Sequence, residues 1–121
     1  YAAYPQNVSF KNGLAISYSK LGDTHSSLGN LDKALTFYED ETQLFEELYA
    51  AYPQNVSFKN GLAISYYKLA QTALANQDPS EARQYFQQAE ALWVALVRDA
   101  PQYVQFQRFL GQVQKDLAKL E

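Results

Sequence analysis

The sequence predicts an all-α fold in which about five helices form antiparallel hairpins stacked as an α-solenoid. Residues 1–18 recur without change as residues 49–66, and weaker similarity continues at the same offset of 48 residues. Apolar residues also recur at steps of three and four along most of the chain, which places them on one face of a helix. Self-similarity at a fixed period of this size is typical of helical solenoids.

A third, partial copy begins at Pro101, which stands 48 residues after Pro53. We therefore expect a single repeat domain with four parts. These are the end of a preceding repeat at 1–5, repeat one at 6–53, repeat two at 54–101 and a C-terminal capping helix at 102–121.

Turn and capping residues set the expected helix boundaries. The Tyr-Pro-Gln-Asn segments at 4–7 and 52–55 separate the hairpins, because proline cannot continue a helix interior, and their asparagines are suited to capping the helices that follow. Gly29-Asn30 combines a helix end with a capping asparagine, and the segment 78–81 combines a capping Asp, a Pro and a capping-box Glu. The expected helices lie near 7–28, 31–51, 55–76, 79–99 and 102–120.

Two Asn-Gly pairs, at 12–13 and 60–61, would ordinarily indicate turns. The apolar steps continue through both pairs, so we interpret Gly13 and Gly61 as helical sites of close packing. Each glycine then costs its helix roughly 1 kcal/mol relative to alanine.

Each expected helix is amphipathic and can bury its apolar stripe only against neighbours, so stacking is required. The opening block of the first hairpin is identical to that of the second, which has a hairpin on its N-terminal side. We therefore expect an apolar N-terminal end that drives head-to-tail self-association or continues into further repeats.

Composition excludes several functions. The chain contains no cysteine, which excludes disulfides and thiolate metal sites, and its net charge of −3 disfavours nucleic-acid binding. No apolar stretch approaches the roughly 18 residues of a membrane helix, and no signal peptide opens the chain, so we expect a cytoplasmic location without membrane association.

The segment containing Asp23, His25 and Ser26 suggests a nucleophilic triad only superficially, because residues two apart on a helix do not face each other. We expect no enzyme, no metal and no cofactor.

The first copy resembles the tetratricopeptide repeat. The matching residues are Tyr18, Leu21, Gly22, His25 in an aromatic position, Gly29, Ala34 and Tyr38. The second copy matches less well, and the resemblance covers essentially the whole chain. The repeat period of 48 residues exceeds the family unit of about 34 residues by roughly 14 residues, or two heptads. This excess indicates a variant with longer helices.

The resemblance implies a right-handed superhelix whose first helices line a concave groove for a peptide or a partner helix. Some family members bind a terminal carboxylate with paired Lys and Asn residues in this groove. Ser19 and Asp23 replace the first such pair here, so we do not expect this chain to bind a terminal carboxylate in that way. The groove positions carried over are Asn12, Ser19, Asp23, Asn60, Tyr67, Gln71, Arg108, Lys115 and Lys119.

The leading functional hypothesis is a protein-interaction scaffold that binds a protein or peptide in this groove. The alternative is a structural spacer or sensor arm of a larger signalling protein, without binding activity of its own. A third hypothesis, RNA binding by a helical repeat, is disfavoured by the acidic balance of the chain.

Overall fold

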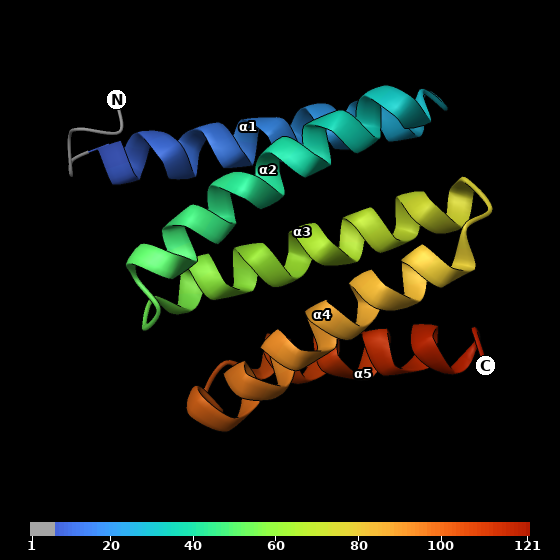
Figure 1. The fold of residues 1–121 in the computed structure, drawn as a ribbon. Coiled ribbons are helices and arrows are strands. Elements are labelled where there is room, and N and C mark those ends of the chain that lie inside the picture. Colours follow the sequence, from blue (N-terminus) through green and yellow to red (C-terminus); the bar gives the residue numbers. More distant parts are fainter. Residues whose placement is uncertain (1–6) are drawn as a thin grey trace.

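The computed structural model describes residues 7–121 as five helices stacked in chain order, as Figure 1 shows. The all-α solenoid prediction is confirmed, and every helix end lies within two residues of its expected position. The helices are α1 (Asn7–Ser27), α2 (Leu31–Ala51), α3 (Val56–Ala75), α4 (Pro79–Asp99) and α5 (Val104–Ala118).

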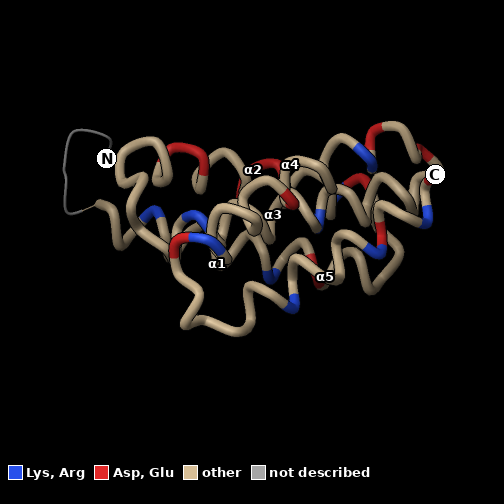
Figure 2. Tube along the Cα trace, turned by 90° about the horizontal axis from the view of Figure 1, so that it is seen from below, with Lys and Arg blue, Asp and Glu red and all other residues tan. Residues whose placement is uncertain are grey.

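The helices form two layers. Each helix packs against the next one in the chain, and α1 also touches α3 directly. In Figure 1, α2 lies in front of α1 and α4 in front of α5, and Figure 2 shows the same separation from below. The first helix of each hairpin, together with α5, therefore forms one layer, which we call the α1–α3–α5 layer, and α2 and α4 form the other.

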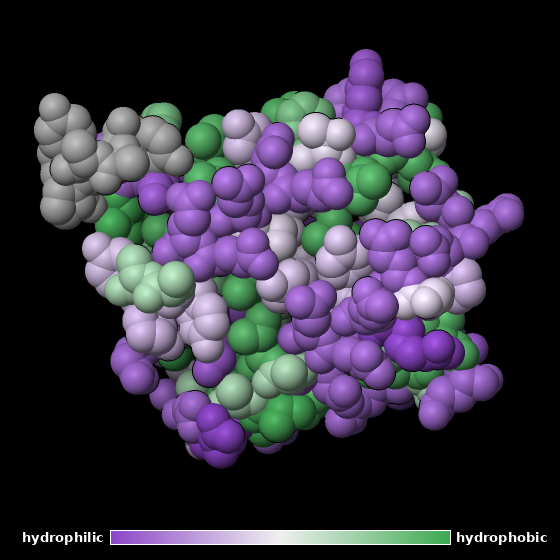
Figure 3. Space-filling view, in the orientation of Figure 1, coloured by the Kyte–Doolittle hydropathy of each residue, from purple (hydrophilic) through white to green (hydrophobic). Residues whose placement is uncertain are grey.

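The α2–α4 layer presents a largely hydrophilic surface, with apolar side chains visible between the helices (Figure 3). Figure 2 shows acidic residues along α2. Within residues 7–121, no helix is both long and apolar enough to cross a membrane.

The core lies where α4 packs between α3 and α5. Phe86, Trp93 and Leu96 of α4 are at most 2% exposed and pack against small residues of α3, including Ala63 and Ala70. Burying a large apolar side chain contributes roughly 1.5–3 kcal/mol, so this cluster is a main source of stability. The small side chains of α3 allow the two helices to approach closely.

Local capping residues account for most helix boundaries. The Asn55 side chain accepts a hydrogen bond from the backbone N–H of Phe58 (3.0 Å), and Asp78 accepts one from Glu81 (3.1 Å). Gly29 ends α1 with φ 81°, in the left-handed region that favours glycine. Asn30 occupies the N-cap position of α2, but its side chain makes no capping bond, so that part of the expectation was wrong.

The two Asn-Gly pairs are helical, as expected, but only one glycine is closely packed. A Cβ added at Gly61 would lie 2.6 Å from the ring of Phe45 on α2. A Cβ added at Gly13 would meet no atom within 4 Å among residues 7–121. The expectation of close packing at Gly13 was therefore wrong, because α2 covers this face of α3 and no described helix covers the equivalent face of α1.

The same contrast extends along the rest of the duplicated segment. Leu69 is 2% exposed and Ser65 is fully buried, whereas their counterparts Leu21 and Ser17 are exposed, Leu21 by 43%. Leu69 packs against Tyr38 and Ala34 of α2. The face of α1 that carries Gly13, Ser17 and Leu21, which we call the outer face of α1, thus lacks an equivalent cover in the described chain.

Candidate binding groove

Two pockets open side by side along α3. The first, the α1–α3 pocket, has a volume of about 360 Å³ and lies between α1 and α3, with α2 beneath it. The second, the α3–α5 pocket, also has a volume of about 360 Å³ and lies between α3 and α5, with Trp93 of α4 in its lining. Ile64 and Lys68 line both pockets, so the two are neighbours, and we call the pair the groove.

The α3–α5 pocket is mainly apolar and aromatic. The rings of Trp93 and Phe109 are stacked with centroids 5.2 Å apart, and Tyr67 lies 5.9 Å from Trp93. The Trp93 indole donates its N–H to Asn60 Oδ1 at 2.9 Å, and the Tyr67 hydroxyl donates to Asp116. These bonds satisfy the polar ends of the aromatic side chains and fix the orientation of their rings.

The α1–α3 pocket is more polar. Asn12, Ser19 and Lys20 come from α1, whereas Asn60 and Lys68 come from α3. The other lining residues come from all three helices and are Ile16, Glu41, Phe45, Ser57, Gly61 and Ile64.

Glu41 is a buried carboxylate in the lining of this pocket. It is 2% exposed, and its Oε1 has no hydrogen-bond partner among residues 7–121. Burial raises the pKa of Glu41 to about 7, against the opposing effects of the Lys68 charge and the Ser19 hydroxyl. A buried, incompletely bonded carboxylate is unfavourable for folding.

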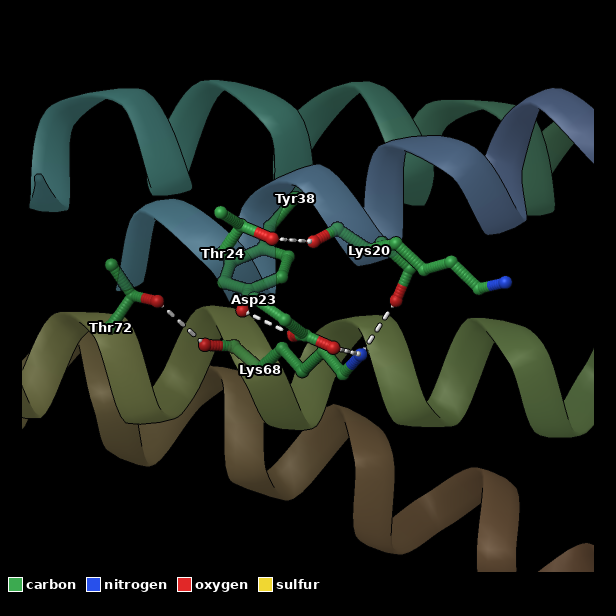
Figure 4. A network of polar contacts seen from close by, with 7 residues as sticks. Lys20, Asp23, Thr24, Tyr38, Lys68 and Thr72 are labelled. Carbon is green, nitrogen blue, oxygen red and sulfur yellow. Dashed lines mark hydrogen bonds and ion pairs between the residues drawn. The ribbon is translucent and has the colours of Figure 1, made fainter. Parts of the chain in front are cut away.

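A polar network next to Glu41 joins three helices, as Figure 4 shows. The Lys68 ammonium donates to Ser19 Oγ at 2.6 Å and to Asp23 Oδ2 at 3.1 Å. The Tyr38 hydroxyl donates to the other Asp23 oxygen at 2.6 Å. Burial and this hydrogen bond raise the pKa of Tyr38 above its ordinary value, so the hydroxyl stays protonated and continues to donate.

The nine sequence-predicted groove residues do not all lie together. Asn12, Ser19 and Asn60 line the α1–α3 pocket, and Tyr67 and Gln71 line the α3–α5 pocket. Asp23 lies beside the first pocket in the polar network. The three basic residues of the C-terminal segment are exposed and line neither pocket: Arg108, Lys115 and Lys119.

Sequence reasoning missed several lining residues, of which Glu41 is the most consequential. A signal for it existed, because Glu41 lies three residues after Tyr38 and three before Leu44, within the apolar stripe of α2. Because burying a charge is unfavourable, a carboxylate within an apolar stripe is a candidate for a functional site. Lys68 gave no comparable signal.

The segment around His25 has a structural explanation. The His25 ring stacks on Phe37 with centroids 5.4 Å apart, in agreement with the expected packed aromatic position. Among residues 7–121, no group of three or more His, Cys, Asp or Glu side chains is placed to hold a metal ion.

Comparison with known proteins supports the repeat interpretation. The model of the tetratricopeptide repeat family matches residues 15–40 and 63–92, two segments that begin 48 residues apart. No curated protein and no solved structure matched the chain. The two matches support a tetratricopeptide-like family of helical repeats for this chain.

Proposed function

We propose that this chain is a protein-interaction module that binds a peptide or a partner helix on its α1–α3–α5 layer. Tetratricopeptide repeats are non-catalytic modules that generally mediate protein–protein interactions. The observation that carries the proposal is the adjacency of the α1–α3 and α3–α5 pockets on this layer. Each pocket is of a size that holds a side chain or a small ligand.

The combination of pocket types supports this function over that of an inert spacer. One pocket is aromatic and the other contains polar and charged groups, so together they offer both apolar contact area and orienting hydrogen bonds. The alternative, a spacer or sensor arm, requires only the packed helices and gives no role to the half-buried Tyr67 and the exposed Gln71 at the rim of the groove.

Substitutions at the groove rim test the proposal without damaging the core. Gln71 is exposed at the rim of the α3–α5 pocket, so Gln71→Arg places a bulky cation over the groove while leaving the helix packing intact. Gln87→Arg introduces the same side chain at an exposed position of α4 outside both pockets and serves as the matched control. Asn60 and Tyr67 are less suitable, because both also support Trp93.

Affinity capture with quantitative mass spectrometry provides the readout. We expect the parent chain and Gln87→Arg to retain the same partners, and Gln71→Arg to lose them. Equal capture by all three proteins would refute binding in the groove, and specific capture by none would favour the spacer function.

We also propose head-to-tail self-association through the N-terminal end of the stack. The residues of α3 that are equivalent to the outer face of α1 are covered by α2. The same side chains on α1 are therefore suited to packing against another helix. The opposite end of the stack also exposes apolar residues, with Tyr103 43% and Val104 59% exposed. A second copy stacked end to end would cover both surfaces.

Sedimentation equilibrium over a range of concentrations tests this association. Leu21→Glu on the outer face of α1 should shift the chain toward monomer, whereas Val94→Glu, at a similarly exposed position on α4, should not. A parent chain that stays monomeric at high concentration would rule out the self-association and would leave the groove proposal unaffected.

A further inference from the structure

We propose that the α1–α3 pocket receives a Lys or Arg side chain of the bound partner, while the α3–α5 pocket receives an apolar or aromatic side chain of the same segment. This inference rests on the proposed function of the groove and specifies its ligand. The basic side chain would pair with Glu41, and the apolar one would pack against Trp93 and Phe109.

The Glu41 carboxylate has unsatisfied hydrogen-bonding capacity. Its Oε1 makes no hydrogen bond within residues 7–121, although the side chain is almost completely buried. A carboxylate withdrawn from water is stabilised by charged hydrogen-bond donors more than by neutral ones. The side chain therefore favours a ligand that supplies such a donor.

The charges around Glu41 do not balance. The groups that face Glu41 from α1 are Ser19 and Asp23, and Lys68 faces it from α3. The Lys68 ammonium is already bonded to Ser19 and Asp23, so two carboxylates share one cation. Tyr38, on the same helix as Glu41, also directs its hydroxyl to Asp23.

Lys20 lines the same pocket, but it is exposed, so its flexible side chain can keep its ammonium in water. With Lys68 committed to Asp23, a ligand cation would complete the charge balance. Because burial raises the pKa of Glu41 to about 7, a bound cation would also favour the ionised carboxylate at neutral pH.

The two pockets are adjacent. Ile64 and Lys68 line both of them, so a short peptide segment that crosses α3 reaches the two pockets together. One segment can therefore place a basic residue in the α1–α3 pocket and a nearby apolar residue in the α3–α5 pocket.

A displayed library of random peptides, selected on the full chain, tests this inference. We expect the selected peptides to share a Lys or Arg and a nearby aromatic or aliphatic residue. Their affinity for the Glu41→Gln variant, measured by fluorescence anisotropy, should fall roughly 10- to 100-fold, as expected for the loss of a hydrogen bond to a charged group.

Two matched controls define the effect. Asp40→Asn removes a carboxylate from an exposed neighbouring position of α2 and should leave the affinity unchanged. Replacing the basic residue of a selected peptide by norleucine should weaken binding to the parent chain but should cause little further loss with Glu41→Gln.

The outcomes separate this inference from the function on which it rests. Peptides that bind in the groove, as shown by loss of binding to Gln71→Arg, but that lack a basic residue or ignore Glu41→Gln would overturn the inference and leave the proposed function intact. If no selected peptide is sensitive to Gln71→Arg, or if none is selected, both the groove function and the inference are overturned.

Discussion

Replacement of Glu41 by glutamine should stabilise the fold, and the gain should depend on pH. The carboxyl is buried, and its pKa rises from an ordinary value of 4.5 to about 7 in the folded chain. At any pH above this value the folded state must hold an ionised group that it disfavours. Glutamine has a similar shape and stays neutral, so Glu41→Gln removes this penalty.

The sign and the size follow from the two pKa values. Because the folded pKa is raised, the stability associated with protonated Glu41 is fully present below pH 4.5 and is lost as the pH rises to about 7. The loss corresponds to about 3 kcal/mol at 1.36 kcal/mol per pH unit, as an order-of-magnitude figure. The advantage of Glu41→Gln should therefore grow by about this amount between pH 4 and pH 8.

Urea denaturation followed by circular dichroism at 222 nm provides the assay, with free energies of unfolding measured at intervals from pH 4 to pH 8. Asp40→Asn, at an exposed site on the same helix, serves as the control for general charge effects. If the curves for the parent and Glu41→Gln run parallel across this range, or if they diverge in the opposite direction, the assignment of a strained carboxylate to position 41 is wrong.

The internal duplication allows two further predictions in which local sequence is held constant. Gly61→Ala should destabilise the chain by about 1–3 kcal/mol, because the new methyl group would collide with the ring of Phe45. Gly13→Ala should stabilise the chain by up to about 1 kcal/mol through helix propensity. Equal effects of the two substitutions on the free energy of unfolding in urea would contradict the difference in packing. Leu69→Ala should cost about 2–5 kcal/mol, as is typical of a buried leucine, and Leu21→Ala less than about 1 kcal/mol. A large loss at Leu21 would show that its face is covered in solution.

The helices themselves could be predicted from sequence because their signals are local. A cap such as Asp78 or Asn55 contacts the backbone three residues away, and Gly29 needs only its own backbone conformation. Such features depend on a few neighbouring residues. Boundaries within two residues of the observed ones are therefore understandable.

Packing could not be predicted in the same way. Gly13 and Gly61 lie in identical sequence, so no local pattern distinguishes them, yet only Gly61 touches an aromatic ring of the preceding helix. The environment of each glycine depends on which element lies before it in the stack. The failure at Gly13 therefore shows the limit of any inference from local sequence.

The groove was only partly predictable, for a related reason. The family resemblance carries groove positions on the first helix of each hairpin, and Asn60 and Gln71 on α3 do line the pockets. Glu41 lies on a second helix and reaches the pocket from beneath, so a scheme based on first helices omits it. The scheme also included the exposed residues Arg108 and Lys115 on α5, whereas Phe109 and Gln112 are the residues of that helix that line the α3–α5 pocket.

Partner binding on the α1–α3–α5 layer is tested most directly by nuclear magnetic resonance, in which a groove-selected peptide is added to ¹⁵N-labelled chain and the side-chain amide signals are followed. We expect the signals of Asn12, Asn60 and Gln71 to shift on binding, while those of Gln43 and Gln87 on the opposite layer stay in place. Shifts confined to Gln43 and Gln87 would contradict binding on the α1–α3–α5 layer.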